Sequence, residues 1–135
     1  AIVRSIKRLG FDASFVPLND IVIAGKKVSG NAQTRKKGVL LQHGTILLNI
    51  DVNKMFSVLK VPSEKVRDKI IKDVKERVTS LSEITFNDMA ISLKTSFAEK
   101  FECKLLADSL SSKEISHAKW LAERKYSSKE WNFKR

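Results

Sequence analysis

The chain has 135 residues, 42% of them hydrophobic, which suits one domain with one apolar core and argues against a disordered segment. Lysine and arginine number 26 against 15 aspartates and glutamates, and this net charge of +11 favours a partner that carries negative charge. No apolar run reaches the length of a membrane span, so we expect a soluble, cytoplasmic protein that contacts no membrane.

The basic residues are spread over nearly every segment of the chain. Aromatic residues make up only 7%, with no stacking run of the kind that RNA-binding sheets use, so we do not expect a nucleic acid partner. An acidic protein or a nucleotide phosphate accounts for the charge equally well, and so does a solvated basic surface. With Cys103 as the single cysteine, no disulfide can form within the chain.

The first half of the chain predicts mainly β-structure. Apolar residues at helical spacing predict one helix over residues 1–10, which Gly10 can end. The segments expected to form strands are 11–16, 21–24, 26–32 and 39–50, and the basic segment 33–38 is expected to form a turn. If the third strand is extended, Lys27 and Ser29 face one side of the sheet and Val28 faces the other.

The second half predicts mainly helices. Asp51 and Ser63 are expected to cap helices over 52–59 and 63–76, with Pro62 breaking the chain between them. Asn87 is the expected cap of a helix over 88–102 with an apolar stripe of Ala90, Leu93, Phe97 and Phe101.

The last segments are an edge strand over 103–107, a helix from 112 to about 126, and a short helix or tail over 127–135. Ser111 and Glu114 form a capping box for the first of these helices, and Trp131 and Phe133 are expected to anchor the tail.

Strands gather in the first half and helices in the second, and no repeat or linker separates them. This order predicts an α+β fold over residues 1–135 as a single domain. We expect a mixed, mostly antiparallel sheet with helices packed on one face.

In the stretch from Asn19 to Asn49, two apolar runs, 21–24 and 39–50, flank a loop that is polar, basic and glycine-rich. This composition is suited to an anionic ligand. On the residues alone, Lys26 and Lys27 are more simply solvent-exposed lysines of a hairpin. Asn19 and Asp20 are likewise a common turn pair.

Three blocks in this stretch, N-D-I, G-K-K-V-S-G-N-A-Q and H-G-T-I-L-L-N, resemble the lipoate–protein ligase family. The similarity continues at E-R-V-T-S-L (76–81) and at E-W-N-F (130–133). The resemblance implies the sheet fold that biotin ligases share with class II synthetases. It covers the C-terminal half of the family's catalytic domain, because the family's upstream triple-glycine loop is not in the sequence. We therefore expect the fold to be incomplete without an N-terminal half.

The activity that this resemblance implies has two steps and uses ATP, lipoate and magnesium. Lipoate is activated to lipoyl-AMP, and the lipoyl group then passes to a lysine of an acceptor lipoyl domain. The implied acceptors are 2-oxo-acid dehydrogenases and the glycine-cleavage carrier protein. Separate chains are expected to supply the N-terminal half, a small accessory domain, or both, as in a split enzyme.

The resemblance assigns the catalytic role to Lys27, whose ammonium would bridge lipoate and ATP. Asn19 and Asp20 are implied to lie beside the adenylate, with Asp20 as a ligand of magnesium. Ser29, Gly30 and Ala32 would let the lipoyl chain and the adenylate lie against the backbone, a role compatible with a tight turn.

His43 is also implied to contact the ligand. It has no second histidine or cysteine at metal-ligand spacing, and a structural histidine is the commoner outcome for such a residue.

Three alternatives stay open. Octanoyl transferases of the superfamily use a cysteine nucleophile, but Cys103 lies in another element and is expected to be small and buried; Pro62 and Ser63 stand where one branch has its cysteine. Biotin ligases usually follow the lysine with G-G-I-L, where this chain has S-G-N-A-Q. The chain could also be a noncatalytic module of the same fold that binds an acidic protein or a nucleic acid.

Overall fold

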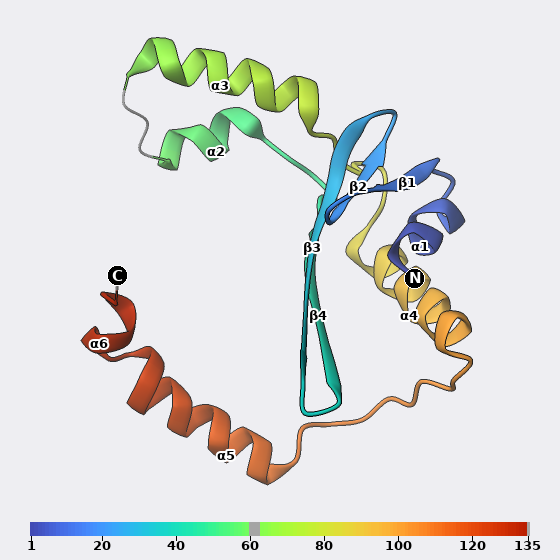
Figure 1. Ribbon diagram of the computed structural model, residues 1–135, viewed down its shortest axis with the longest axis vertical. Coiled ribbons are helices and arrows are strands. Elements are labelled where there is room, and N and C mark those ends of the chain that lie inside the picture. Colours follow the sequence, from blue (N-terminus) through green and yellow to red (C-terminus); the bar gives the residue numbers. More distant parts are fainter. Residues whose placement is uncertain (60–62, 135) are drawn as a thin grey trace. The chain divides into compact units, whose positions relative to one another are not determined.

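The computed structural model describes residues 1–59 and 63–134, so the break expected at Pro62 lies outside the described residues. It divides the chain into two compact units, residues 1–103 and residues 104–135 (Figure 1). Among the described residues, no helix is both long enough and apolar enough to cross a membrane.

The first unit contains one antiparallel sheet of four strands in the order β1-β2-β3-β4. The strands are β1 (Ala13–Val16), β2 (Asp20–Ile23), β3 (Lys26–Lys36) and β4 (Val39–Ile46). Together with the helices described below, this sheet confirms the predicted α+β class and its antiparallel pairing.

The β3–β4 hairpin is longer than the sequence suggested (Figure 1). The predicted turn over 33–38 is wrong, because Gln33 pairs with Gln42 and Arg35 pairs with Leu40 across the two strands. The chain reverses only at Lys37 and Gly38, which have φ angles of 52° and 76°. Two consecutive positive φ angles match the twist of a hairpin, so a two-residue turn replaces the expected loop.

A β-bulge between β2 and β3 corrects the expected alternation at the start of β3. Ile21 pairs with Ser29 and Val22 pairs with Lys27, which leaves Val28 as the extra residue on β3. Val28 and Ser29 are both buried, whereas Lys27 stays partly exposed. Lys27 and Ser29 therefore do not share the same surroundings, contrary to the prediction.

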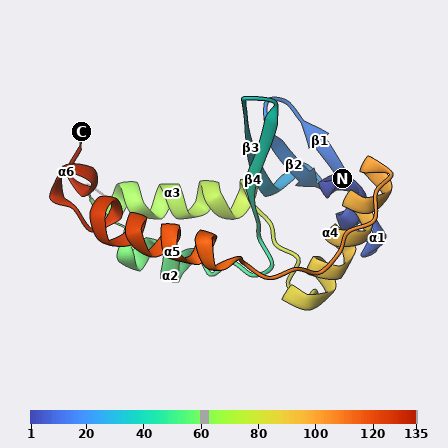
Figure 2. The same ribbon diagram turned by 90° about the horizontal axis from the view of Figure 1, so that it is seen from below.

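Two helices, α1 (Ile2–Arg8) and α4 (Phe86–Phe101), bury the core against one face of this sheet (Figure 2). Its buried members are Ile6, Ala13, Ile21, Val28, Leu81 and Met89. The expected cap at Asn87 is wrong, because Thr85 caps the helix. The Thr85 side chain accepts a hydrogen bond from the Asp88 N–H, and the Asp88 carboxylate accepts one from the Thr85 N–H, which forms a capping box.

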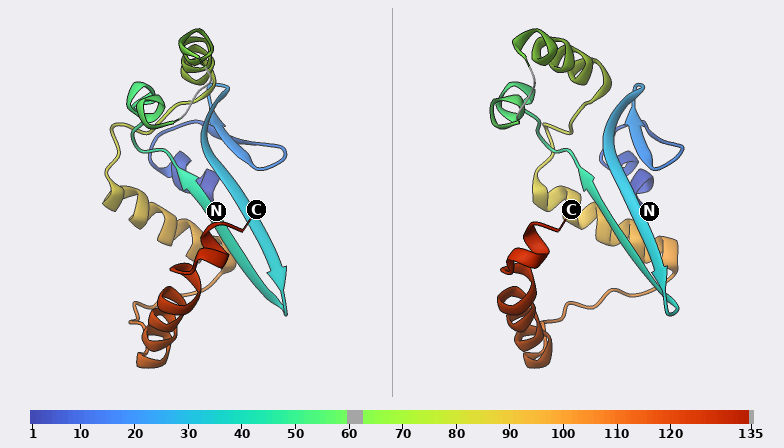
Figure 3. Two further views of the ribbon diagram at one scale, coloured as in Figure 1. Left: turned by 90° about the vertical axis from the view of Figure 1, so that its left-hand side faces the viewer. Right: turned by 60° about the vertical axis from the view of Figure 1, so that its left-hand side comes forward.

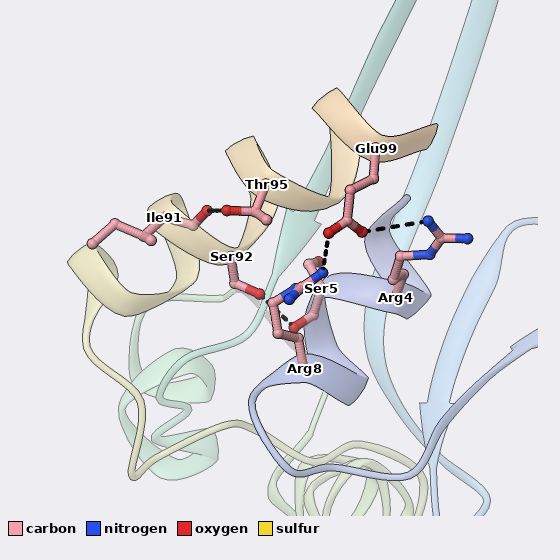
Figure 4. A network of polar contacts seen from close by, with 7 residues as sticks. All are labelled: Arg4, Ser5, Arg8, Ile91, Ser92, Thr95 and Glu99. Carbon is pink, nitrogen blue, oxygen red and sulfur yellow. Dashed lines mark hydrogen bonds and ion pairs between the residues drawn. The ribbon is translucent and has the colours of Figure 1, made fainter. Parts of the chain in front are cut away.

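The α1–α4 interface uses small side chains, as Figure 4 shows. Ser92 Oγ donates to the Ser5 carbonyl at 2.8 Å, and Glu99 pairs with Arg4 and Arg8 at the rim. Serine at these positions lets the two helices approach closely. Of the predicted stripe, Leu93 packs against the core and Ala90 and Phe97 are partly buried, whereas Phe101 is 60% exposed.

The helices α2 (Val52–Val58) and α3 (Glu64–Arg77) begin at the predicted caps, where Asp51 and Ser63 accept from backbone N–H groups. After α3 the chain runs parallel to the start of β3, and the Thr79 N–H donates to the Lys27 carbonyl at 2.8 Å (Figure 3). This pairing fixes the end of α3 beside the first residues of β3.

The second unit contains α5 (Ser112–Leu121), a π-helical turn η1 (Ala122–Tyr126) and α6 (Lys129–Asn132). The predicted capping box of Ser111 and Glu114 is confirmed. The predicted strand over 103–107 is wrong, because these residues are exposed and form no ladder, and a strand needs a paired neighbour. Trp131 packs edge-on against Tyr126 at 5.3 Å, whereas Phe133 is 77% exposed and anchors nothing.

We predict that Leu81→Ala lowers the free energy of unfolding by about 2–5 kcal/mol, because the Leu81 side chain is fully buried in the core. Urea unfolding followed by circular dichroism measures the change. Leu18, which is 94% exposed, supplies the control, and Leu18→Ala should change the free energy of unfolding by no more than about 0.5 kcal/mol. Equal effects of the two substitutions would contradict this placement of the core.

We predict that the start of α5 loosens in acid. Hydrogen bonds from the Ser111 side chain and backbone hold the pKa of Glu114 below its ordinary value of 4.5. A lowered folded-state pKa means that the cap contributes fully above pH 4.5 and is lost as the pH falls through the folded-state pKa. A carboxyl-carbon NMR titration of Glu114 measures the pKa. Ser111→Ala should return the pKa toward 4.5, and a titration identical to that of the unaltered chain would refute the role of the cap.

Candidate functional site

An ion pair between Lys27 and Asp20 lies where β2 and β3 meet. The Lys27 ammonium is 2.7 Å from Asp20 Oδ1, and the two side chains are 43% and 32% exposed. Asp20 begins β2 and Lys27 is the second residue of β3, so adjacent strands supply the two charges. Partial burial limits screening by water, so the attraction between the two charges is stronger than in a fully exposed pair.

Gly30 makes room for the Lys27 side chain. A Cβ atom built on Gly30 would lie 3.1 Å from Lys27 Cε and 3.2 Å from Lys27 Nζ. Both contacts are tighter than ordinary packing, so a side chain at position 30 would require the end of the Lys27 side chain to shift by a few tenths of an ångström. The glycine of the K-V-S-G block therefore keeps Lys27 over the strand and beside Asp20.

A hollow of about 400 Å³ opens beside this ion pair. It is lined by Asp20, Lys27, Asp73, Val74, Arg77 and Val78. Two cationic and two anionic side chains thus converge on one space, and they come from β2, β3 and α3. Such a group suits a ligand that carries several charged oxygens.

Asp20 Oδ1 faces the Lys27 ammonium and is shielded from solvent. It accepts no hydrogen bond of favourable direction from the described residues, so its partner is the Lys27 charge, held by ionic attraction. A cation that bound the same oxygen would compete with Lys27.

Asn19 and Ser29 lie beside the ion pair but not in the hollow. Asn19 Nδ2 donates to the Asn31 carbonyl at 2.8 Å, and Asn31 Nδ2 donates to the Ser29 hydroxyl at 3.1 Å. Ser29 is only 1% exposed. These contacts hold the loop before β2 against β3, so both side chains support the backbone that carries Lys27.

Ala32 and His43 are cross-strand partners on the β3–β4 hairpin, and both are exposed. Alternation along β3 places Ala32 on the face of Gly30, where Lys27 lies. The two residues extend this face along the hairpin but do not line the hollow. Among the described residues, no three histidine, cysteine, aspartate or glutamate side chains cluster as a metal site.

The other face of the hairpin borders a hollow of about 370 Å³. Its walls include Phe15, Leu40, Gln42, Phe97 and Phe101. Most of these side chains are apolar, and the rings of Phe97 and Phe101 stack with centroids 6.0 Å apart. The hairpin contributes Leu40 and the amides Asn31, Gln33 and Gln42 to this second hollow, and its apolar walls come mainly from other elements.

Sequence reasoning missed two members of the first hollow, Asp73 and Arg77. Arg77 belongs to the E-R-V-T-S-L block, so the resemblance marked the segment without giving the residue a role. Cys103 is exposed and the expectation that it is buried is wrong, because the chain leaves α4 there without a neighbouring element to cover it.

Comparisons with known proteins agree with this arrangement. The family described as "Lipoyl protein ligase A/B catalytic domain" matches residues 1–102. The octanoyltransferase LipM of Geobacillus kaustophilus (strain HTA426) is 40% identical over 121 residues, which cover 86% of this chain and 44% of that protein.

Two solved structures are similar to the chain as well. A bi-partite lipoate protein ligase, studied with its E2 lipoyl domain from Thermoplasma acidophilum, superposes with a TM-score of 0.87 at 37% identity, over 97% of this chain and 53% of that chain. A lipoate-protein ligase A bound with ATP superposes with a TM-score of 0.77 at 29% identity, over 97% and 54%. The chain thus spans about half the length of these relatives.

The matched region takes in the sheet, the core helices and the whole charged hollow. The resemblance in the sequence blocks is confirmed, and the relatives include both ligases and transferases of lipoylation. The chain belongs to the lipoyl protein ligase A/B catalytic domain family.

Proposed function

We propose that this chain supplies part of the catalytic unit of an AMP-forming lipoate–protein ligase. In the first step a lipoate carboxylate oxygen attacks the α-phosphorus of ATP and pyrophosphate leaves. In the second step a lysine amine of an acceptor lipoyl domain attacks the acyl carbon and AMP leaves. The observation that carries the proposal is the Lys27 ammonium held at the mouth of a charged hollow.

Lys27 addresses the main obstacle to the first step, which is that two anions must approach each other. A fixed ammonium between the carboxylate and the α-phosphate offsets their repulsion and stabilises the charge that gathers on oxygen. Asp20 and Gly30 keep that ammonium in place before the substrates arrive. Such preorganisation avoids the cost of ordering a free lysine during the reaction.

Magnesium fits the same hollow. Asp20 and Asp73 line it and would supply carboxylate oxygens. Magnesium is usually bound by one or two carboxylates together with substrate phosphates. When bound, the ion would neutralise phosphate charge and orient the leaving group.

The hairpin face beside Lys27 suits the acyl chain. Gly30 and Ala32 follow one another along β3 with His43 opposite Ala32 on β4, and the first two have little or no side chain. A long, flexible acyl chain could therefore lie against the backbone there. Asn19 and Ser29 do not contact the acyl chain in this arrangement. Their hydrogen bonds with Asn31 hold β3 in position.

Octanoyl transfer is the second candidate, and it is favoured by the 40% identity to LipM. That reaction requires a cysteine that forms a thioester, and the single cysteine of this chain is Cys103. Cys103 follows α4 and does not line the hollow beside Lys27. A thioester on Cys103 after incubation with octanoyl-carrier protein would favour transfer over ligation.

We predict that Lys27→Ala lowers the rate of lipoyl-AMP formation by about 10²–10³-fold, because the charge between the two reacting anions is lost. The rate is measured as release of pyrophosphate with ATP, magnesium and lipoate, with the complementary chain and an acceptor lipoyl domain present.

Lys36→Ala is the matched control, since Lys36 is the last residue of the same strand, is exposed and does not line the hollow. It should leave the rate within about twofold. Equal rates in the Lys27 variant and the unaltered chain would rule out the role of this ammonium.

The proposal includes a complementary polypeptide that completes the sheet. β4 is an outer strand of the described sheet, and its Val39, Leu40 and Leu41 are 67%, 43% and 61% exposed. A free edge with apolar side chains is a common site for the addition of a strand. The bi-partite relative, of which this chain covers 53%, supports the idea that other chain segments take this place.

We predict that binding of the remaining part of the Thermoplasma acidophilum subunit slows amide exchange in β4 by at least about tenfold, because new strand hydrogen bonds protect these amides. Exchange is followed by mass spectrometry on the full chain. Leu40→Asp should abolish the protection, whereas Val58→Asp, at an exposed position of α2, should not. A stable complex without protection of β4 would place the interface elsewhere.

A further inference from the structure

We propose that Arg77 binds the pyrophosphate portion of ATP, as the second fixed cation of the hollow that contains Lys27. This inference rests on the proposed function, because it assigns a residue to the nucleotide of that reaction. Arg77 ends α3, fifty positions after Lys27 in the chain, and both side chains line the same space of about 400 Å³. A space of this size falls in the usual range of ligand sites.

The backbone holds Arg77 next to Lys27. Val78, the residue after Arg77, forms a parallel bridge with Lys27, and the Thr79 N–H donates to the Lys27 carbonyl at 2.8 Å. Lys26 strengthens the junction by donating from Nζ to the Lys75 carbonyl at 3.3 Å. The two cations are therefore positioned by one pairing of backbone segments rather than by flexible loops.

The pairing state of the two cations differs. Lys27 is neutralised by Asp20 at 2.7 Å, whereas Arg77 forms no ion pair within 4.0 Å among the described side chains. Asp73 is on the same helix and lines the same hollow, but it does not come within that distance of the Arg77 guanidinium. Arg77 thus offers an uncompensated charge to the hollow.

The order of the phosphates in ATP indicates which of them the Arg77 guanidinium would contact. Lys27 is placed between the carboxylate and the α-phosphate in the proposed first step, so the β- and γ-phosphates extend from it to the next cation. Guanidinium groups bind phosphate oxygens through two parallel N–H donors, which suits a leaving pyrophosphate better than a single ammonium does. Arg77 therefore receives the charge that builds on the leaving group.

A purely structural reading of Arg77 makes a different prediction. A basic residue in the last turn of α3 also offsets the negative end of the helix dipole. In that case its removal would lower stability and leave phosphate binding unchanged. Binding of the two products separates the readings, because pyrophosphate should need Arg77 whereas AMP should not.

The test is calorimetric titration of the full chain with inorganic pyrophosphate, AMP and ATP in the presence of magnesium. Arg77→Gln should weaken pyrophosphate and ATP binding about tenfold or more, the usual effect of losing a charged hydrogen bond, and change AMP binding less than about twofold. Arg77→Lys should fall between, since it keeps the charge but loses the planar pair of donors.

Arg67→Gln is the matched control, because Arg67 is on the same helix and lines a separate hollow with Asn53, Asp68 and Ile71. It should bind pyrophosphate as the unaltered chain does, and thermal unfolding should show that both variants fold. Unchanged pyrophosphate binding in folded Arg77→Gln overturns the inference and leaves the ligase proposal standing. Arg77-dependent pyrophosphate binding in a chain that forms no adenylate with its complementary half would instead overturn the ligase proposal.

Discussion

The site depends on how the backbone of Lys27 is held from two sides. On one side β2 pairs with β3 through a bulge that sets Val28 into the core. On the other side Thr79 donates to the Lys27 carbonyl. A lysine on a free hairpin would sample many positions, and ordering it during catalysis would cost conformational entropy. Here the backbone and Asp20 restrict the ammonium before any ligand binds, and Gly30 leaves the space that it occupies.

The segment that pairs with Lys27 also belongs to the hydrophobic core. Leu81 lies two residues after Thr79, is fully buried, and donates its backbone N–H to the Leu47 carbonyl after β4. The segment 78–81 therefore contacts the start of β3 and the end of β4 while it fills the core. Loss of core packing at this segment would also loosen the position of Lys27, so the role proposed for Lys27 depends on the stability of the core there.

Much of the fold could be predicted from local signals. The caps at Asp51, Ser63 and Ser111 and the start of β4 depend on residues close in sequence, and the structure agrees with them, although β4 ends at Ile46 and the predicted strand ran to residue 50. The bulge at Val28 and the serine-lined contact of α4 could not be predicted, because each depends on a distant partner. Arg77 was missed for the same reason. Its sequence block was noticed, but only the parallel bridge shows that it lies beside Lys27.

The β3–β4 hairpin separates two tasks by the simple alternation of a strand. Odd and even positions of β4 face different surroundings, with His43 on the side of Lys27 and Leu40 and Gln42 on the side of Phe97. Substitutions on one side can therefore retune ligand recognition without disturbing the contacts of the other. Because neighbouring positions of β4 face different surroundings, the residues of one face can change during evolution while those of the other stay the same.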